Sequence, residues 1–205
     1  MKQEFPRAAA IRFGWETAKK NIRFFLVVLL IVFGISFLFS TLDSSFSEEA
    51  VMPRFITGLL SWVVSSITSI GLIKISLNFV EKKESKYTDL FTYYDRTVNY
   101  MAGSILYGLI IVAGLILLVV PAIYWGVRLQ FYSYLVTEKN LGPIQALKGS
   151  WNMTADHTWQ LFVYGLIVMG INILGMLALF IGMFWTIPTT QIATAYIYKN
   201  LSKKN

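Results

Sequence analysis

Apolar residues in this chain run in stretches longer than the core helix of a soluble protein needs. The longest uncharged stretch, Thr158–Tyr198, has 41 residues without Asp, Glu, Lys or Arg. A helix rises about 1.5 Å per residue and crosses a membrane with about 20 residues, so this stretch has twice the length of one crossing. Residues 99–137 form a second stretch of 39 residues, whose single charge is Arg128. The pattern predicts an all-α membrane protein whose spans are joined as hairpins.

Six transmembrane helices fit this pattern. They are expected at about 22–41, 55–75, 99–117, 119–137, 159–178 and 182–199. An even number of crossings puts both termini on one side, and 16 of the 18 Lys and Arg residues fall in segments on that side. Lys and Arg are enriched in cytoplasmic segments, so both termini are expected in the cytoplasm.

Two polar-rich segments have the apolar periodicity of helices that lie at a membrane surface. One precedes the first span and includes Trp15, and the other, at 143–157, includes Trp151. Apolar residues recur there at steps of three and four, with charged residues on the remaining faces. We expect both to be amphipathic helices in the cytoplasmic headgroup layer. They would seat the bundle, with lipid sensing or docking of a partner as the alternative.

Two segments of the chain have similar sequences, which indicates an internal repeat. A shift of 136 residues aligns 10–35 with 146–171, and it matches Trp15 with Trp151. Each unit would be an amphipathic helix followed by a hairpin, in the same orientation every time. We therefore expect a single domain, 1–205, with three units at 5–85, 86–140 and 141–202.

The amino-acid composition is typical of a membrane protein, and it excludes several kinds of functional site. Charged residues make up 14% of the chain, against about 25% in soluble domains. The absence of cysteine excludes disulfides, zinc–thiolate sites and a thiol nucleophile. The net charge of +7 is better explained by topology and anionic headgroups than by nucleic acid, which we do not expect as a partner.

Arg128 is the most unusual residue, because an arginine near mid-membrane is costly unless it is paired or wetted. No acidic residue lies in the predicted spans to neutralise it. Two interpretations stay open: a polar cavity for an anionic headgroup or small anion, or an anchor to backbone carbonyls near Pro121. The candidate polar site comprises Arg128, Lys74, Gln191 and Asn172. Interfacial anchors are expected at Trp15, Trp151 and Trp159, and proline positions at the start of returning spans are Pro121 and Pro188.

Nothing in the sequence predicts catalysis. The one histidine, His157, lies at the start of a span beside Asp156 and cannot form a metal site or triad alone. No phosphate-binding loop, metalloprotease motif or serine-hydrolase motif is present. We expect no enzyme activity, no cofactor and no metal.

Short motifs in the second half carry a family resemblance. The stretches 118–129, 141–154 and 159–162 resemble bacterial integral membrane proteins of the YciC type and the membrane domain of some glycerophosphodiester phosphodiesterases. The matching positions are Pro121, Arg128, Ala146, Ser150, Thr154, Pro188 and Tyr196. Ala122 stands where that group usually has glycine, so we expect a less tight turn there in this chain. The resemblance implies a bacterial plasma-membrane location and a six-helix bundle, without phosphodiesterase activity.

Three functions follow as expectations, and the third, beside the two described next, is a membrane partner of an enzyme encoded separately. The first is a non-enzymatic accessory, envelope-maintenance or tolerance factor that acts through contacts with lipid and with another membrane protein or a second copy. The alternative is a small transporter or a lipid- or anion-binding protein with a polar cavity at Arg128.

Overall fold

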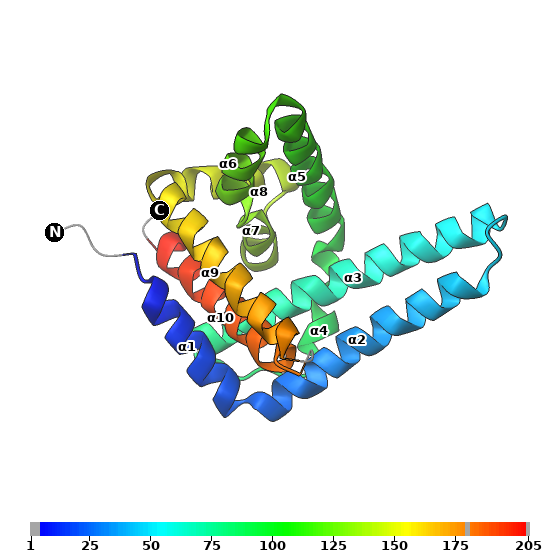
Figure 1. Ribbon diagram of the computed structural model, residues 1–205, viewed down its shortest axis with the longest axis horizontal. Coiled ribbons are helices and arrows are strands. Elements are labelled where there is room, and N and C mark those ends of the chain that lie inside the picture. The colour runs from blue at the N-terminus through cyan, green and yellow to red at the C-terminus, as the bar shows by residue number, and fades with distance from the viewer. Residues whose placement is uncertain (1–4, 179–180, 204–205) are drawn as a thin grey trace.

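The computed structural model describes residues 5–178 and 181–203, and it is all-α over them (Figure 1). The helices in chain order are α1 (Arg7–Lys20), α2 (Ile22–Ser45), α3 (Val51–Val80), α4 (Asp89–Thr92), α5 (Thr97–Leu117), α6 (Val119–Leu129), α7 (Tyr132–Lys139), α8 (Pro143–Met153), α9 (Thr158–Leu177) and α10 (Met183–Ser202). Short 3-10 helices, Tyr94–Arg96 and Ala155–His157, lead into α5 and α9.

Within residues 5–178 and 181–203, four helical segments are long and apolar enough to cross a membrane. They are Ile22–Ser45, Val51–Val80, Asp89–Leu117 and Ala155–Leu177. The chain therefore has the character of a multi-pass membrane protein. The expected span at 119–137 is divided between α6 and α7, and α10 is not among the four, because its threonines and glutamine lower its hydropathy.

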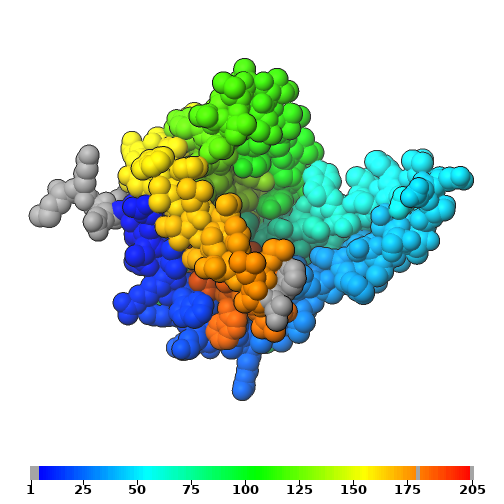
Figure 2. Space-filling model, viewed as in Figure 1, coloured from blue at the N-terminus to red at the C-terminus, as the bar shows by residue number. Residues whose placement is uncertain are grey.

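The helices pair as hairpins that point in different directions and do not form one parallel bundle. The α2–α3 hairpin projects from the rest of the molecule, while α5 and α6 meet at a separate tip (Figures 1 and 2). The α5–α6 turn consists of one extended residue, Leu118. It can be this short because a Cβ on Gly114 would lie 2.8 Å from the Cα of Ala122, so the helices touch through backbone. Gly175 and Gly182 make the same kind of contact where α9 returns as α10.

We call α1, α4 and α8 the connecting helices, because each precedes a hairpin in the chain. Each of them packs against the second helix of a different hairpin. A Cβ on Gly14 of α1 would lie 2.3 Å from the carbonyl oxygen of Thr189 in α10, and one on Gly71 of α3 would lie equally close, 2.3 Å, to that of Leu90 in α4. The third connecting helix, α8, hydrogen-bonds the end of α6. Because α1 closes on the last helix, the three contacts form a cycle. This order of elements agrees with three units, which remain a prediction.

The face of α1 that packs against α10 consists of small residues. Ala10, Gly14 and Ala18, one helical turn apart, are buried against α10, while Trp15 is 48% exposed. Trp15 lies with its ring 6.0 Å from that of Trp185, near the start of α10. The two helices therefore run antiparallel, side by side (Figure 1). Contact through small residues brings the backbones close together, as is common between membrane helices.

Candidate functional site

Arg128 lies in the last turn of α6 and is buried, with 7% of its surface exposed. One terminal nitrogen donates to the Tyr124 hydroxyl at 2.8 Å, and the other donates to the Trp151 carbonyl at 2.7 Å. The guanidinium also lies over the Trp151 ring, 4.1 Å from its centroid. Hydrogen bonds and a cation–π contact from α6 and α8 thus replace much of the hydration that burial removes.

The backbone around Arg128 is held by the same helix. Its carbonyl accepts hydrogen bonds from the hydroxyls of Ser150 at 2.9 Å and Thr154 at 3.0 Å. The Phe131 N–H donates to Ser150 at 3.1 Å. In a continuous helix these backbone groups would bond within the helix. The two α8 hydroxyls therefore satisfy the groups that are freed where α6 ends and α7 begins.

The two terminal nitrogens of Arg128 each make a hydrogen bond, and its third nitrogen does not. Its Nε is buried and has no hydrogen-bond partner among the described residues. The terminal nitrogens of the guanidinium are therefore held by hydrogen bonds, whereas the hydrogen-bonding capacity of Nε is unused.

The other residues of the predicted polar site lie on different helices with contacts of their own. Lys74 of α3 lies over the Tyr93 ring, 5.3 Å from its centroid. Asn172 of α9 donates to the Val168 carbonyl at 3.0 Å and to Thr190 at 3.4 Å. Gln191 lies in α10 and is half-buried. Lys74 and Asn172 are thus joined to their own neighbours and not to Arg128.

A cluster of charged side chains that the sequence pattern did not predict joins the ends of three helices. Lys199 of α10 forms ion pairs with Glu81 at the end of α3 and with Glu138 of α7. Tyr198 donates to Glu138 at 2.6 Å. Hydrogen bonds from Lys199 and then from Lys83 lower the pKa of the Glu81 carboxyl to about 2. The repeated pattern of aromatics followed by lysine at 79–82, 134–139 and 196–199 was the signal that could have found it.

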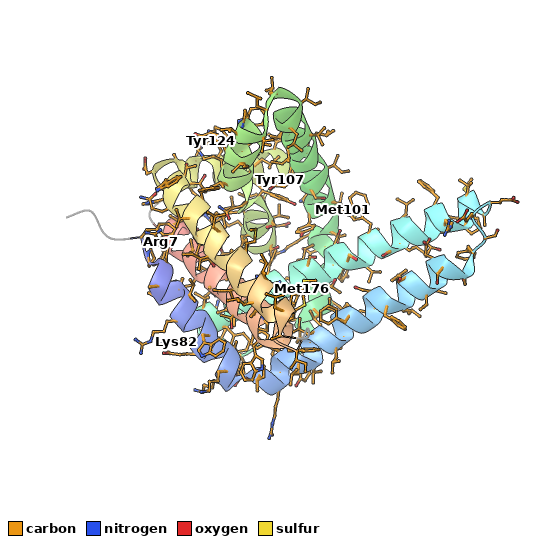
Figure 3. All side chains as sticks on the ribbon, viewed as in Figure 1. Arg7, Lys82, Met101, Tyr107, Tyr124 and Met176 are labelled. Atoms are coloured by element: carbon orange, nitrogen blue, oxygen red, sulfur yellow. The ribbon has the colours of Figure 1, made fainter. Side chains whose placement is uncertain are left out.

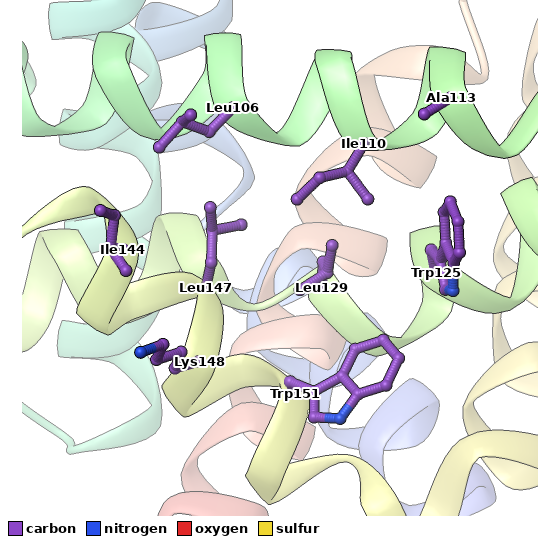
Figure 4. A pocket seen from close by; sticks show the side chains of 9 residues that line it. All are labelled: Leu106, Ile110, Ala113, Trp125, Leu129, Ile144, Leu147, Lys148 and Trp151. Atoms are coloured by element: carbon purple, nitrogen blue, oxygen red, sulfur yellow. The ribbon is translucent and has the colours of Figure 1, made fainter.

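An apolar groove of about 600 Å³ lies between α5, α6 and α8 (Figure 4). Eight apolar side chains and one lysine line it: Leu106, Ile110, Ala113, Trp125, Leu129, Ile144, Leu147, Lys148 and Trp151. Trp151 therefore has two roles, because its ring covers Arg128 and also forms part of the groove wall.

The remaining predicted positions are spread over the molecule. Trp159 at the start of α9 is 70% exposed, as an interfacial side chain would be. Pro121 lies in the first turn of α6, as expected. Pro188 lies inside α10, which continues through it, and not in the first turn. Figure 3 shows how densely side chains cover the helices. Among the described residues, no group of three His, Cys, Asp or Glu side chains could hold a metal.

Comparison with known proteins identifies the family of this chain, and the function of that family is unknown. A family model described as "Protein of unknown function (DUF975)" matches residues 44–205. This match covers more than half of the 205 residues, so the chain belongs to that family. No curated protein and no solved structure matches the chain.

Proposed function

We propose that this chain is a non-enzymatic protein of the bacterial plasma membrane that acts through contacts with lipid and other membrane proteins. Envelope maintenance or tolerance of membrane-active agents would be the physiological outcome. The resemblance to YciC-type inner-membrane proteins supports this location.

One observation carries this proposal: the charged side chains of the interior are used to join helices, and the outward surface is apolar. Arg128 bonds Trp151 across α6 and α8, and Lys199 bonds Glu81 and Glu138 across three helix ends. On the outside, large apolar side chains are widely exposed, including Phe37, Val51, Ile116, Val120 and Trp159. Apolar patches of this extent are typical of surfaces covered by lipid or by another protein.

The polarity of the hairpin turns supports a placement of this surface in the membrane. Asp43 lies in the last turn of α2, and Glu48 and Glu49 lie in the α2–α3 turn. The two helices have 24 and 30 residues. At about 1.5 Å per residue, both exceed the thickness of the hydrocarbon layer of roughly 30 Å. We therefore expect this hairpin to cross the membrane and its turn to face the outside.

The α5–α6 turn has the opposite character. Every residue from Ile116 to Val120 is apolar and exposed. The returning helix α6 has 11 residues and would extend only about 16 Å. A turn without polar groups is more stable in hydrocarbon than in water, so we expect this tip to end inside the bilayer.

The α9–α10 turn lies beside basic residues. Lys19 of α1 lines the same hollow as Gly182 and Trp185. If the basic residues are cytoplasmic, Gly182 cannot lie on the far side of a bilayer about 30 Å thick. We expect α9–α10 to enter and leave from the cytoplasmic side. This arrangement replaces the six crossings expected from hydropathy, and it keeps both termini cytoplasmic.

A transporter or anion-binding protein is the second candidate, and the unsatisfied Nε of Arg128 favours it. An anion that reached this atom would gain a charge-assisted hydrogen bond.

Flux through proteoliposomes separates the two functions. Purified protein is reconstituted with an entrapped chloride- or phosphate-sensitive dye, and anion entry is compared with that of empty liposomes. The first proposal predicts no difference. Entry that is lost in Arg128→Lys would overturn it and support the alternative. In cells, deletion of the gene should lower resistance to membrane-active peptides several-fold, and unchanged resistance would count against an envelope role.

A further inference from the structure

We infer that the groove between α5, α6 and α8 binds one acyl chain of a phospholipid whose anionic headgroup is held by Lys148. This inference rests on the proposed membrane placement, and it assigns a ligand class to a site that the function above leaves open.

The groove has the size and lining of a ligand pocket. Its volume of about 600 Å³ lies within the range of roughly 300–1,000 Å³ that is typical of small-molecule sites. Eight of its nine lining residues are apolar, and two of these are tryptophans. The long, flexible hydrocarbon chain of a lipid suits such a wall, whereas a free anion or a sugar would leave its polar groups unsatisfied.

The groove also has a direction. Lys148 and Ile144 lie at one end, and Ala113 and Trp125 lie at the other (Figure 4). Along α5 the lining runs from Leu106 through Ile110 to Ala113, toward the apolar α5–α6 tip. A lipid with its headgroup at Lys148 would therefore direct its chain toward the part of the hairpin that we place in hydrocarbon.

Lys148 is suited to an anionic headgroup. It is exposed, and in the part of the chain that the structure describes it forms no ion pair. It lies on α8, whose residues are expected at the cytoplasmic headgroup layer. A single lysine near an anionic membrane surface strengthens the binding of its protein segment to that surface by about five-fold. Charge complementarity therefore selects an anionic over a zwitterionic lipid.

Photocrosslinking in nanodiscs tests the site. The discs contain equal amounts of phosphatidylglycerol and phosphatidylcholine, and either lipid carries a diazirine near the end of its acyl chain. With wild-type protein, the phosphatidylglycerol probe should label peptides of α5, α6 and α8 about five-fold more than the phosphatidylcholine probe. Labelling spread evenly over all lipid-facing helices would overturn the inference, because that pattern is expected of bulk lipid. Labelling concentrated in the groove but equal for both probes would overturn the role of Lys148.

Matched variants localise the effect. Ala113→Trp places bulk in the groove, and Val112→Trp, on the same helix but outside the lining, is its control. We expect groove labelling to fall at least five-fold in the first and to stay unchanged in the second; equal labelling in both would overturn the inference. Lys148→Ala should remove the headgroup preference, whereas Lys139→Ala should keep it. The wild-type probe comparison holds even if a variant misfolds. The flux and topology measurements do not depend on the groove, so the proposed function can stand if this site fails.

Discussion

At the scale of single residues, the charged groups with most influence on this fold join helices. Arg128 links α6 to α8 by a hydrogen bond to Trp151 and a cation–π contact with the same residue. Lys199 links α10 to the end of α3 and to α7 by ion pairs with Glu81 and Glu138. Both sites lie where regular helix hydrogen bonding ends, and charged donors can satisfy carbonyl or carboxylate oxygens there.

Arg128→Ala should lower the free energy of unfolding by roughly 2–3 kcal/mol, because it removes a charge-assisted hydrogen bond and the cation–π contact. Arg128→Lys should lose less, since one ammonium keeps the charge without the two-directional donors. Thermal unfolding in detergent, followed by tryptophan fluorescence, measures both. An alanine variant as stable as the wild type would show that Arg128 is not an anchor.

The cluster at Lys199 predicts a pH dependence. The pKa of Glu81 is lowered to about 2 from an ordinary 4.5, chiefly by Lys199 and also by Lys83. Its contribution to stability is thus present above pH 4.5 and is lost as the pH falls toward 2. Lys199→Met leaves two carboxylates facing each other at neutral pH. The melting temperature of this variant should lie well below that of the wild type at pH 7, and the gap should narrow on acidification; a gap that widens would contradict this account.

At the scale of elements, glycines decide where helices meet. A Cβ on Gly14 would approach the Thr189 carbonyl oxygen to 2.3 Å, so α1 and α10 must separate to accept any side chain there. The same holds for Gly71 against α4. By contrast, a Cβ on Gly34 of α2 would have no neighbouring atom within 4 Å.

Gly14→Ala should therefore displace α1 and lower the melting temperature by several degrees, through overpacking of a close helix contact. Gly34→Ala is the matched control. It should be neutral or stabilising by about 0.5–1 kcal/mol, because alanine favours the helix over glycine. Limited proteolysis reports whether α1 has detached, with cleavage expected after Arg12 or Lys19. Equal cleavage of the two variants would show that α1 does not depend on this contact.

The difference between sequence and structure is sharpest at these elements. Hydropathy was sufficient to predict an all-α chain, the α2–α3 hairpin and the helices α1 and α8. It did not predict that Ala10 and Gly14 pack against α10, because such small residues carry little hydrophobic signal. The break between α6 and α7 could not be foreseen either, since it depends on Ser150, about twenty residues later.

The candidate site was predicted only in part. Arg128 stood out because a single charge interrupts an apolar stretch. Its contact with Trp151 was not predicted, because the two residues lie 23 positions apart and on different helices. Lys74, Asn172 and Gln191 were grouped with it by polarity alone, and polarity does not say which helices become neighbours.

At the scale of the whole molecule, the hairpins differ in what their turns present. One turn is acidic, one is wholly apolar, and one lies beside the basic helix α1. From these turns we propose one hairpin that crosses the membrane and two hairpins that enter the bilayer without leaving it on the far side.

Accessibility of single cysteines tests this placement most directly, because the chain has no cysteine of its own. Ser45→Cys, Ile181→Cys and Lys203→Cys place one thiol at the α2–α3 turn, the α9–α10 turn and the C-terminal end. A membrane-impermeant maleimide applied to intact cells should label position 45 and neither 181 nor 203, and position 203 should react after permeabilisation. Labelling of position 181 from outside would contradict the account, because α9 and α10 would then both cross the membrane. A protected 45 with an accessible 203 would invert the orientation.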